Sequence, residues 1–275
     1  MDRIRQAVER ARAAQSLPRD PVADHAGLPP RRMDSPSVQA MPSAATGEIA
    51  LNGAYLQSRR VIAYNGADQR SRPYDMLRTQ VLQSMDVGGW KTLAVTSPTP
   101  NCGKTLTALN LAFSIARQPD RAVVLVDLDL QKPLIADSLG LALANGGALD
   151  VLEERSTLAR EAALIRAGTQ RLVVLPTAAT RESSELMGSR QMRQLLQDLR
   201  RNYPSHIIIL DLPPILSSDD VIALLPQIDC VLLVAAVGTS KVSEIEECNR
   251  HLQSSHLVRL VVNKSTDANA NYYYY

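Results

Sequence analysis

The chain has 275 residues, 45% of them apolar, and its 30 basic and 28 acidic residues leave a net charge of +2. That length allows one domain of about 180 to 200 residues with flanking segments, and the charge balance gives no reason to expect nucleic acid or an anionic membrane as a partner. Three widely spaced cysteines, Cys102, Cys230 and Cys248, indicate neither a disulfide framework nor a zinc site and suit a reducing cytosol.

The first sixty residues divide into two segments. Residues 1–15 predict a short amphipathic helix, because apolar residues recur on one face at i, i+3, i+4 and i+7 spacing. These apolar residues are Ile4, Ala7, Val8 and Ala11. A helix this short is not stable alone, so the segment is either a frayed terminus or a helix that docks on a partner. Residues 16–48 are rich in Pro, Ser, Ala and Asp, and we predict a disordered linker over residues 16–60.

Residues 61–265 predict a folded domain. Apolar, β-branched runs alternate with helix-like segments: the runs are at 92–97, 122–126, 172–175, 207–210, 231–235 and 257–262, and the segments are at 104–117, 189–202, 219–225 and 241–253. Continuous apolar strands separated by helices are typical of a parallel sheet covered on both faces. We therefore expect an α/β fold of the P-loop NTPase kind, with a mostly parallel sheet.

Membrane-spanning and secretory segments are not indicated. No apolar run approaches the ~20 residues needed to span a bilayer, and the first residues, MDRIRQAVERA, lack the apolar core of a signal peptide. We therefore expect a cytoplasmic protein that reaches a membrane only through a partner.

A phosphate-binding loop follows the first run, in LAVTSPTPNCGKT. The order of strand, tight loop, Gly-Lys-Thr and helix is that of a P-loop, whose backbone N–H groups cradle phosphates. We expect residues 101–106 (Asn101, Cys102, Gly103, Lys104, Thr105 and Leu106) to bind a nucleotide, with Lys104 at the β- and γ-phosphates and Thr105 on Mg²⁺. Pro98 stands where the pattern has glycine, and Asn101 tolerates the left-handed backbone that the loop needs.

Carboxylates end two further strands. Asp127 and Asp129 follow the second run, and Asp211 follows the run HIIIL. Ligands of open α/β sheets bind at the carboxyl ends of the strands, and neighbouring carboxylates there require a cation, so we expect Asp129 and Asp211 to organise Mg²⁺. Asn263 follows the last run at the same edge, where it either hydrogen-bonds an adenine or forms a turn.

These motifs together resemble the bacterial tyrosine kinase (BY-kinase) family, the cytoplasmic autokinases of capsule and exopolysaccharide assembly. The stretches that carry the resemblance are VTSPTPNCGKT, VVLVDLDLQKP, HIIILDLPP and the four tyrosines Tyr272, Tyr273, Tyr274 and Tyr275. The resemblance implies that ATP and Mg²⁺ are cofactors and that Asp127 accepts the proton of an incoming tyrosine. It also implies phosphorylation of the tyrosine cluster within a flexible tail, residues 266–275, between subunits of a homo-oligomer.

Partners follow from the same resemblance. A membrane polysaccharide co-polymerase, or chain-length determinant, would activate the kinase at the inner membrane, and a protein-tyrosine phosphatase would reset it. Phosphorylation of all four tyrosines would add about −6 to −8 charges, which gives a route to release an inserted tail and loosen subunit association.

The sequence departs from the family in two places. Asn101-Cys102 replaces the usual Gly-Glu, and the oligomerisation motif E-x-x-R-x-x-R is only partly present in RSRPYDMLRTQVLQ, with Arg78 at the place of the final arginine and Asp75 and Arg72 nearby. Two alternatives therefore stay open. One is a non-catalytic nucleotide-binding scaffold of the polysaccharide machinery. The other is a partition-type positioning ATPase, which carries an early lysine in the loop where this chain has Thr99.

Overall fold

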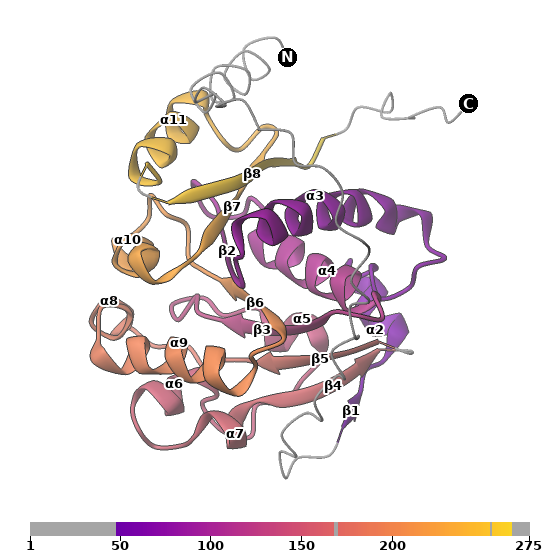
Figure 1. Ribbon diagram of the computed structural model, residues 1–275, viewed down its shortest axis with the longest axis vertical. Helices are drawn as coiled ribbons and strands as arrows, with labels where there is room; N and C mark the ends of the chain where they lie inside the picture. Colours follow the sequence, from indigo (N-terminus) through magenta and orange to yellow (C-terminus); the bar gives the residue numbers. More distant parts are fainter. Residues whose placement is uncertain (1–47, 168–169, 254, 266–275) are drawn as a thin grey trace, which may run out of the picture. The chain divides into compact units, whose positions relative to one another are not determined.

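A computed structural model describes residues 48–167, 170–253 and 255–265. The helix predicted over residues 1–15 and the tyrosine-rich segment 266–275 lie outside this range. The described residues form one sheet of eight strands in the order β1-β4-β5-β3-β6-β2-β7-β8. Neighbouring strands are parallel except β4 and β5, which are antiparallel. The predicted α/β fold with a mostly parallel sheet is confirmed (Figure 1).

The strands are β1 (Ile49–Ala50), β2 (Thr92–Thr96), β3 (Ala122–Asp127), β4 (Ala163–Ala167), β5 (Gln170–Leu175), β6 (His206–Asp211), β7 (Cys230–Ala236) and β8 (His256–Asn263). The longer helices are α3 (Arg72–Gly88), α4 (Lys104–Ala116), α9 (Arg190–Asn202) and α11 (Val242–His251). Short helices are α2 (Gly53–Ser58), α5 (Ile135–Leu139), α6 (Ala148–Leu152), α7 (Leu158–Glu161), α8 (Ser183–Met187) and α10 (Asp220–Leu224). The 3-10 turns are η1 (Gln69–Ser71) and η2 (Leu225–Gln227).

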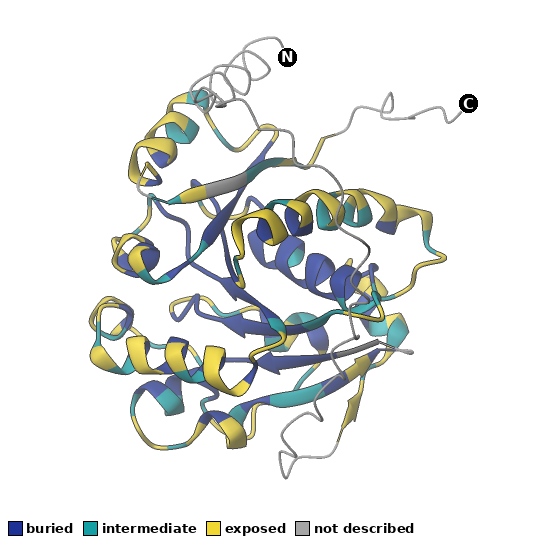
Figure 2. Ribbon diagram, viewed as in Figure 1, coloured by how far each residue is buried: buried dark blue, intermediate teal, exposed yellow. Residues whose placement is uncertain are grey.

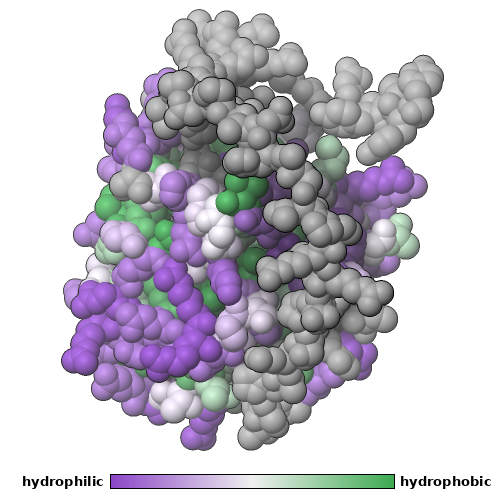
Figure 3. Space-filling model, viewed as in Figure 1, coloured by the Kyte–Doolittle hydropathy of each residue, from purple (hydrophilic) through white to green (hydrophobic). Residues whose placement is uncertain are grey.

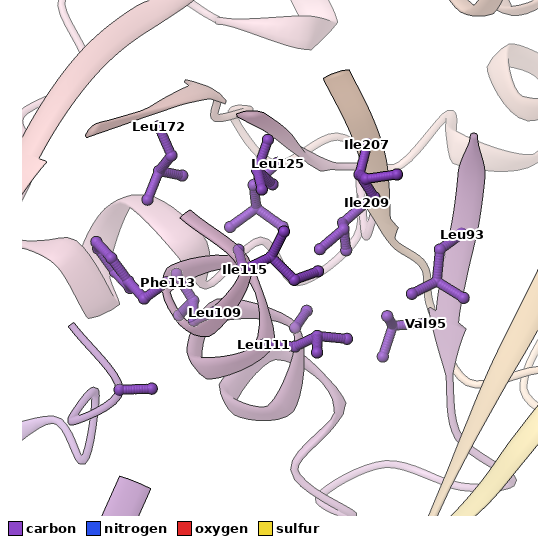
Figure 4. Packing of buried hydrophobic residues seen from close by; sticks show 14 of the residues in the cluster. Leu93, Val95, Leu109, Leu111, Phe113, Ile115, Leu125, Leu172, Ile207 and Ile209 are labelled. Atoms are coloured by element: carbon purple, nitrogen blue, oxygen red, sulfur yellow. The ribbon is translucent and has the colours of Figure 1, made fainter. Parts of the chain in front are cut away.

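Helix α4 packs at the centre of one face of the sheet and is buried along most of its length (Figure 2). Side chains alternate between the two faces of a strand, and every second residue of the central strands points at α4. The residues that share this core include Leu93, Val95, Val123, Leu125, Ile207 and Ile209, with Leu109, Leu111, Phe113 and Ile115 from the helix (Figure 4). This packing fixes the first turn of α4 against the ends of β2, β3 and β6.

Helices cover both faces of the sheet. Helices α3 and α4 lie on one side, and α9, α10 and α11 lie on the other (Figure 1). The outer surface over α8 and α9 is strongly hydrophilic (Figure 3), as expected of an amphipathic helix whose apolar face is buried. No helix in the described part of the chain has the length and apolar character needed to cross a bilayer.

The structure differs from the predicted linker over residues 48–60. Strand β1 pairs with β4, and the Leu51 amide donates to the Arg166 carbonyl at 2.7 Å. Asn52 caps α2 by accepting from the Ala54 amide at 2.9 Å. These elements are too short to show a periodic pattern, and both depend on distant parts of the chain: β1 pairs with β4, and Tyr55 of α2 contacts Asp137 of α5. The folded domain therefore includes residues before 61.

One buried side chain anchors the next turn of this segment. Asn110 of α4 accepts hydrogen bonds from the backbone amides of Ile62 and Ala63 at 2.8 and 3.0 Å. Its amide nitrogen donates to the carbonyls of Arg60 and Leu106 at 3.1 and 2.9 Å. A buried amide with all four groups paired holds its neighbours in one arrangement, so residues 60–63 are fixed against the helix that begins at Lys104.

Candidate nucleotide and phosphoryl-transfer site

The phosphate loop has the backbone that its sequence predicts. Asn101 and Gly103 are both left-handed, with φ of 63° and 90°. A Cβ atom at Gly103 would lie 2.3 Å from Nδ2, the side-chain amide nitrogen of Asn263. Glycine is therefore required at 103 by both its φ and its neighbour, and the loop passes directly into the first turn of α4, whose free N–H groups favour an anion.

Lys104 lies among carboxylates from two other strands. Its Nζ is 2.6 Å from Asp129 Oδ2 and 3.8 Å from Asp211 Oδ1. Burial disfavours the ammonium, but the nearby Asp211 and Asp129 carboxylates outweigh it and raise the pKa of Lys104. The predicted convergence of these three residues at one edge of the sheet is present, and the lysine is held as a cation where phosphate oxygens would meet it.

Asp211 is fully buried, and neither of its carboxylate oxygens has a hydrogen-bond partner among the described groups. Burial, opposed chiefly by the Lys104 charge, raises its pKa to about 6. A buried carboxylate without hydrogen bonds is costly, and a cation would satisfy it. The Thr105 hydroxyl lies beside it in the site, 3.3 Å from Lys104 Nζ.

These donors fit Mg²⁺. Magnesium is usually held by one or two carboxylates together with phosphate oxygens and waters rather than by a full protein cage. The described residues contain no group of three or more His, Cys, Asp or Glu side chains arranged as a metal cluster. Asp211, Asp129 and Thr105 could thus hold the ion only together with a nucleotide.

Asp127, which the resemblance implies is the proton acceptor, lies below the floor of the site. Its carboxylate is fully buried, and Oδ2 accepts from the backbone amides of Leu134 and Ile135 at 3.1 and 3.0 Å, which fixes the start of α5. Oδ1 accepts only one longer bond, 3.3 Å from the Asp129 amide. Burial, together with the Asp211 charge, raises the pKa of Asp127 well above its ordinary value. The side chain therefore has a structural task, and only its Oδ1 keeps hydrogen-bonding capacity that is weakly used.

Asn263 lies at the predicted edge, but protein groups occupy its amide. Its Nδ2 donates to the Cys102 carbonyl at 2.9 Å, and its Oδ1 accepts from the Lys264 amide at 2.8 Å. The Cys102 side chain points away from the cavity, with Sγ 3.3 Å from the Ser240 hydroxyl. In this structure β8 thus braces the phosphate loop, a role that the sequence alone did not suggest.

A cavity of about 590 Å³ opens beside the phosphate loop. Its lining includes the predicted Asn101, Gly103, Lys104, Thr105, Leu106 and Asp129. It also includes three cations that sequence reasoning left without a role: Arg59, Lys132 and Lys264. Lys264 Nζ donates to the Asn101 carbonyl at 2.6 Å, so its charge is not neutralised by that bond. Arg59 comes from the segment predicted as linker and therefore had no recognisable motif.

The partial oligomerisation motif is used within the chain. Asp75 of α3 accepts two hydrogen bonds from Arg117, both at 2.8 Å, and one from the Ser114 hydroxyl at 2.5 Å. Arg78 lies 3.4 Å from Asp75 and donates to the Ser114 carbonyl at 3.1 Å. All these groups are mostly buried, so the cluster ties α3 to α4.

The chain is similar to nucleotide-binding proteins and to tyrosine-protein kinases. The CobQ/CobB/MinD/ParA nucleotide binding domain matches residues 93–273. EpsB of Ralstonia solanacearum, named as a provisional tyrosine-protein kinase, is 31% identical over 225 residues, which are 81% of this chain and 29% of EpsB. The tyrosine-protein kinase YwqD of Bacillus subtilis is 27% identical over 81% of this chain and 93% of its own length. The kinase domain of Escherichia coli tyrosine kinase ETK has a TM-score of 0.65 at 25% identity, covering 76% of this chain and 81% of that one.

Proposed function

Because the chain belongs to the CobQ/CobB/MinD/ParA nucleotide-binding family, we propose that it is an ATP-dependent protein-tyrosine kinase that phosphorylates its own cluster Tyr272–Tyr275. The observation that carries the proposal is the position of Lys264. This residue lines the phosphate cavity, so the segment with the four tyrosines begins at the rim of that cavity. Eight residues from Lys264 to Tyr272 span at most about 28 Å, which allows the tyrosines to enter a cleft of their own or of another copy.

The residues at the sheet edge have distinct tasks in this proposal. Lys104 binds and neutralises the phosphates, and Thr105, Asp129 and Asp211 hold Mg²⁺ with its waters. ATP supplies the phosphoryl group and Mg²⁺ neutralises part of its charge, so the protein contributes mainly positioning and electrostatics. Asp127 takes the tyrosine proton through Oδ1, and its raised pKa favours this task because an acceptor with a higher pKa removes a proton more readily.

The resemblance to tyrosine-protein kinases supports the part of the proposal that concerns the cellular process and the partners. EpsB and YwqD bear that name, and the chain spans less than a third of EpsB, so activity and partners are inferred for this chain. We propose that it acts in exopolysaccharide or capsule assembly, as a homo-oligomer held at the inner membrane by a chain-length determinant protein. Transfer between copies and reversal by a tyrosine phosphatase complete the cycle.

Three variants incubated with radiolabelled ATP and Mg²⁺ test the activity. Wild type should incorporate label, whereas Lys104→Met and a variant with all four cluster tyrosines replaced by Phe should not. Lys91→Met serves as a matched control, because Lys91 precedes β2 far from the loop and should label normally. ATP hydrolysis without protein label would support a positioning ATPase, and nucleotide binding without hydrolysis would support a scaffold.

A further inference from the structure

A second cavity adjoins the phosphate cavity. It has a volume of about 350 Å³ and is lined by Ser58, Arg59, Arg60, Leu134, Asp137 and Ser138. Three of these residues, Arg59, Leu134 and Ser138, also line the phosphate cavity. No phosphate-loop residue lines the second cavity, so it lies beside the nucleotide cradle. We call it the guanidinium pocket.

The pocket carries more positive charge than its single carboxylate balances. Arg59 forms an ion pair with Asp137, and their side chains are 40% and 60% exposed. Arg60 is exposed and has no ion-pair partner within the described residues. An exposed pair is easily rearranged, so a dianion entering the pocket would meet two guanidinium groups against one carboxylate.

The two arginines are held in place by the fold. The Arg59 guanidinium lies over the Tyr55 ring, 5.8 Å from its centroid, and the Tyr55 hydroxyl donates to the Asp137 carbonyl at 2.8 Å. Arg60 has a left-handed backbone with φ of 62°, and its carbonyl accepts from the buried Asn110 amide at 3.1 Å. A left-handed non-glycine residue persists only where its surroundings impose it. The turn is therefore built and rigid, as a binding site requires.

The remaining lining suits a phosphorylated aromatic ring. Leu134 is 38% exposed and offers an apolar contact to a ring. The Ser138 side chain has no hydrogen bond to another described residue, so its hydroxyl can donate to a phosphate oxygen. Arginine pairs, hydroxyls and one apolar surface are the groups that recognise phosphotyrosine.

We propose that the guanidinium pocket binds a phosphotyrosine of a partly phosphorylated cluster and thereby holds a neighbouring tyrosine at the phosphate cavity. This rests on the proposed kinase function. Neighbouring residues of an extended chain are 3.8 Å apart at Cα, and the two cavities share three lining residues, so adjacent tyrosines can occupy both at once. In each transfer the bond from Pγ to the ADP oxygen breaks, the bond to the tyrosine oxygen forms, and the phenolic proton passes to Asp127.

The consequence is a preference for substrates that already carry phosphate. Each phosphotyrosine carries about −1.5 to −2 charges, whereas a carboxylate carries one, so an acidic peptide without phosphate should bind more weakly. The first transfer to the cluster is then the slow one, and later transfers follow on the same chain before it leaves.

Synthetic peptides TDANANYYYY, unmodified or phosphorylated at the position of Tyr273, test the pocket by direct binding. The protein is the full chain with its four cluster tyrosines replaced by Phe, saturated with ADP and Mg²⁺ to occupy the phosphate loop. The phosphopeptide should bind at least about tenfold more tightly than the unmodified peptide. A third peptide with Glu at the same position distinguishes phosphate recognition from general attraction to acid.

Variants place the effect in the pocket. Arg60→Ala should reduce the preference for phosphopeptide severalfold, and Arg59→Ala together with Arg60→Ala should abolish it. Arg60→Lys should lose most of it, because lysine lacks the bidentate fork. Arg121→Ala, which removes a half-buried arginine paired with Asp86 on another surface, is the matched control and should leave the preference unchanged. An unchanged melting temperature of each variant shows that the fold is intact.

The outcomes separate this proposal from the kinase proposal. Equal binding of phosphorylated and unmodified peptides, while the wild-type chain incorporates label, overturns the pocket and leaves the kinase. Preference retained by the double arginine variant also overturns it. No label on the wild-type chain incubated with radiolabelled ATP and Mg²⁺ overturns the kinase, whatever the binding result. In mass spectra of labelled wild type, multiply phosphorylated chains should exceed singly phosphorylated ones early in the reaction, and the double variant should accumulate the singly phosphorylated form.

Discussion

Lys104 and Asp129 form an ion pair of 2.6 Å across the floor of the phosphate cavity. The pair lies where a nucleotide's phosphates would bind the lysine, so phosphates must compete with the carboxylate. We expect Asp129→Asn to bind ADP about tenfold more tightly than wild type without Mg²⁺, since a charge-assisted hydrogen bond contributes about 1.5–3 kcal/mol.

The same variant should lose the gain in affinity that Mg²⁺ gives wild type, because Asp129 is proposed to hold the ion. Titration calorimetry with and without Mg²⁺ measures both effects, and Asp86→Asn, in an exposed pair, is the control. An Asp129→Asn protein that binds ADP more weakly in both conditions would contradict the competition.

Asp211 should destabilise the protein at neutral pH. Its folded pKa of about 6 lies above the ordinary value of 3.8, so the folded state binds the proton more tightly than the unfolded state. The stability gained from the protonated form is complete below about pH 4 and is lost as the pH rises through about 6. At pH 7.5 the cost is at most about 3 kcal/mol.

Asp211→Asn should therefore raise the melting temperature at pH 7.5 by several degrees without nucleotide, and the difference should shrink toward pH 4. It should also lose the stabilisation that ADP with Mg²⁺ gives wild type. Calorimetric melting across pH measures this, with Asp198→Asn, near the surface of α9, as control. A lower melting temperature for Asp211→Asn at pH 7.5 would count against the argument.

Asp75 should stabilise each chain individually. Because Arg117 and Arg78 lose their common partner in Asp75→Asn, we expect the free energy of unfolding to fall by about 2 kcal/mol, less than for a fully buried pair. Asp86→Asn, which breaks the exposed pair with Arg121, should cost under about 1 kcal/mol. Urea unfolding measures both. An effect that grows with protein concentration would indicate instead that Asp75 acts at an interface between copies.

Asn263 should support nucleotide binding by stabilising the phosphate loop, and it should not recognise the adenine base. Loss of its bond to the Cys102 carbonyl in Asn263→Ala should weaken ATP and GTP binding by the same factor, about fivefold for one hydrogen bond of about 1 kcal/mol. If Asn263 recognised adenine, the Asn263→Ala variant would instead lose affinity for ATP and keep its affinity for GTP. Paired titrations of the two nucleotides distinguish these roles, and Thr239→Ala in a nearby turn serves as control.

Transfer between copies can be tested by mixing two defective proteins. The Lys104→Met chain retains its tyrosines but cannot use ATP, and the chain with cluster tyrosines replaced by Phe retains the site. We expect label on the Lys104→Met chain only when both are present, because the segment from Lys264 can extend about 28 Å from its own cavity. Label that never appears in the mixture, while wild type labels itself, would show transfer within one chain.

The sequence predicted the central sheet well because each buried strand is a continuous apolar run. The apolar run predicted at residues 207–210 became β6 (His206–Asp211), so its boundaries differ from the prediction by one residue at each end. Strand β4 was missed: its sequence ALIRA is short and mixed, and its place depends on antiparallel pairing with β5. Local pattern carries no information on such pairing.

Residues of the candidate site were likewise predictable where a local motif marks them and not predictable where they depend on distant contacts. Lys104, Asp129 and Asp211 were found because each follows a strand within a local motif, and parallel strands bring their ends together. Arg59 and two partners of Asp75, Ser114 and Arg117, could not be found, since each contact joins residues about forty or more positions apart. The left-handed Asn101 was predictable from its side chain, whereas the anchoring of α5 by Asp127 depends on how the following loop closes.

The four hydrogen bonds of Asn110 have a mechanical consequence. Asn110 lies six residues after Lys104 in α4, about 9 Å along the helix axis. Its side chain is hydrogen-bonded to the turn that follows Arg59. A displacement of the residues before this turn would therefore act on α4, the helix that begins at Lys104. The Asn110 side chain thus couples the position of residues 60–63 to the phosphate loop. An apolar side chain of the same size would form none of these hydrogen bonds and would leave the two segments uncoupled.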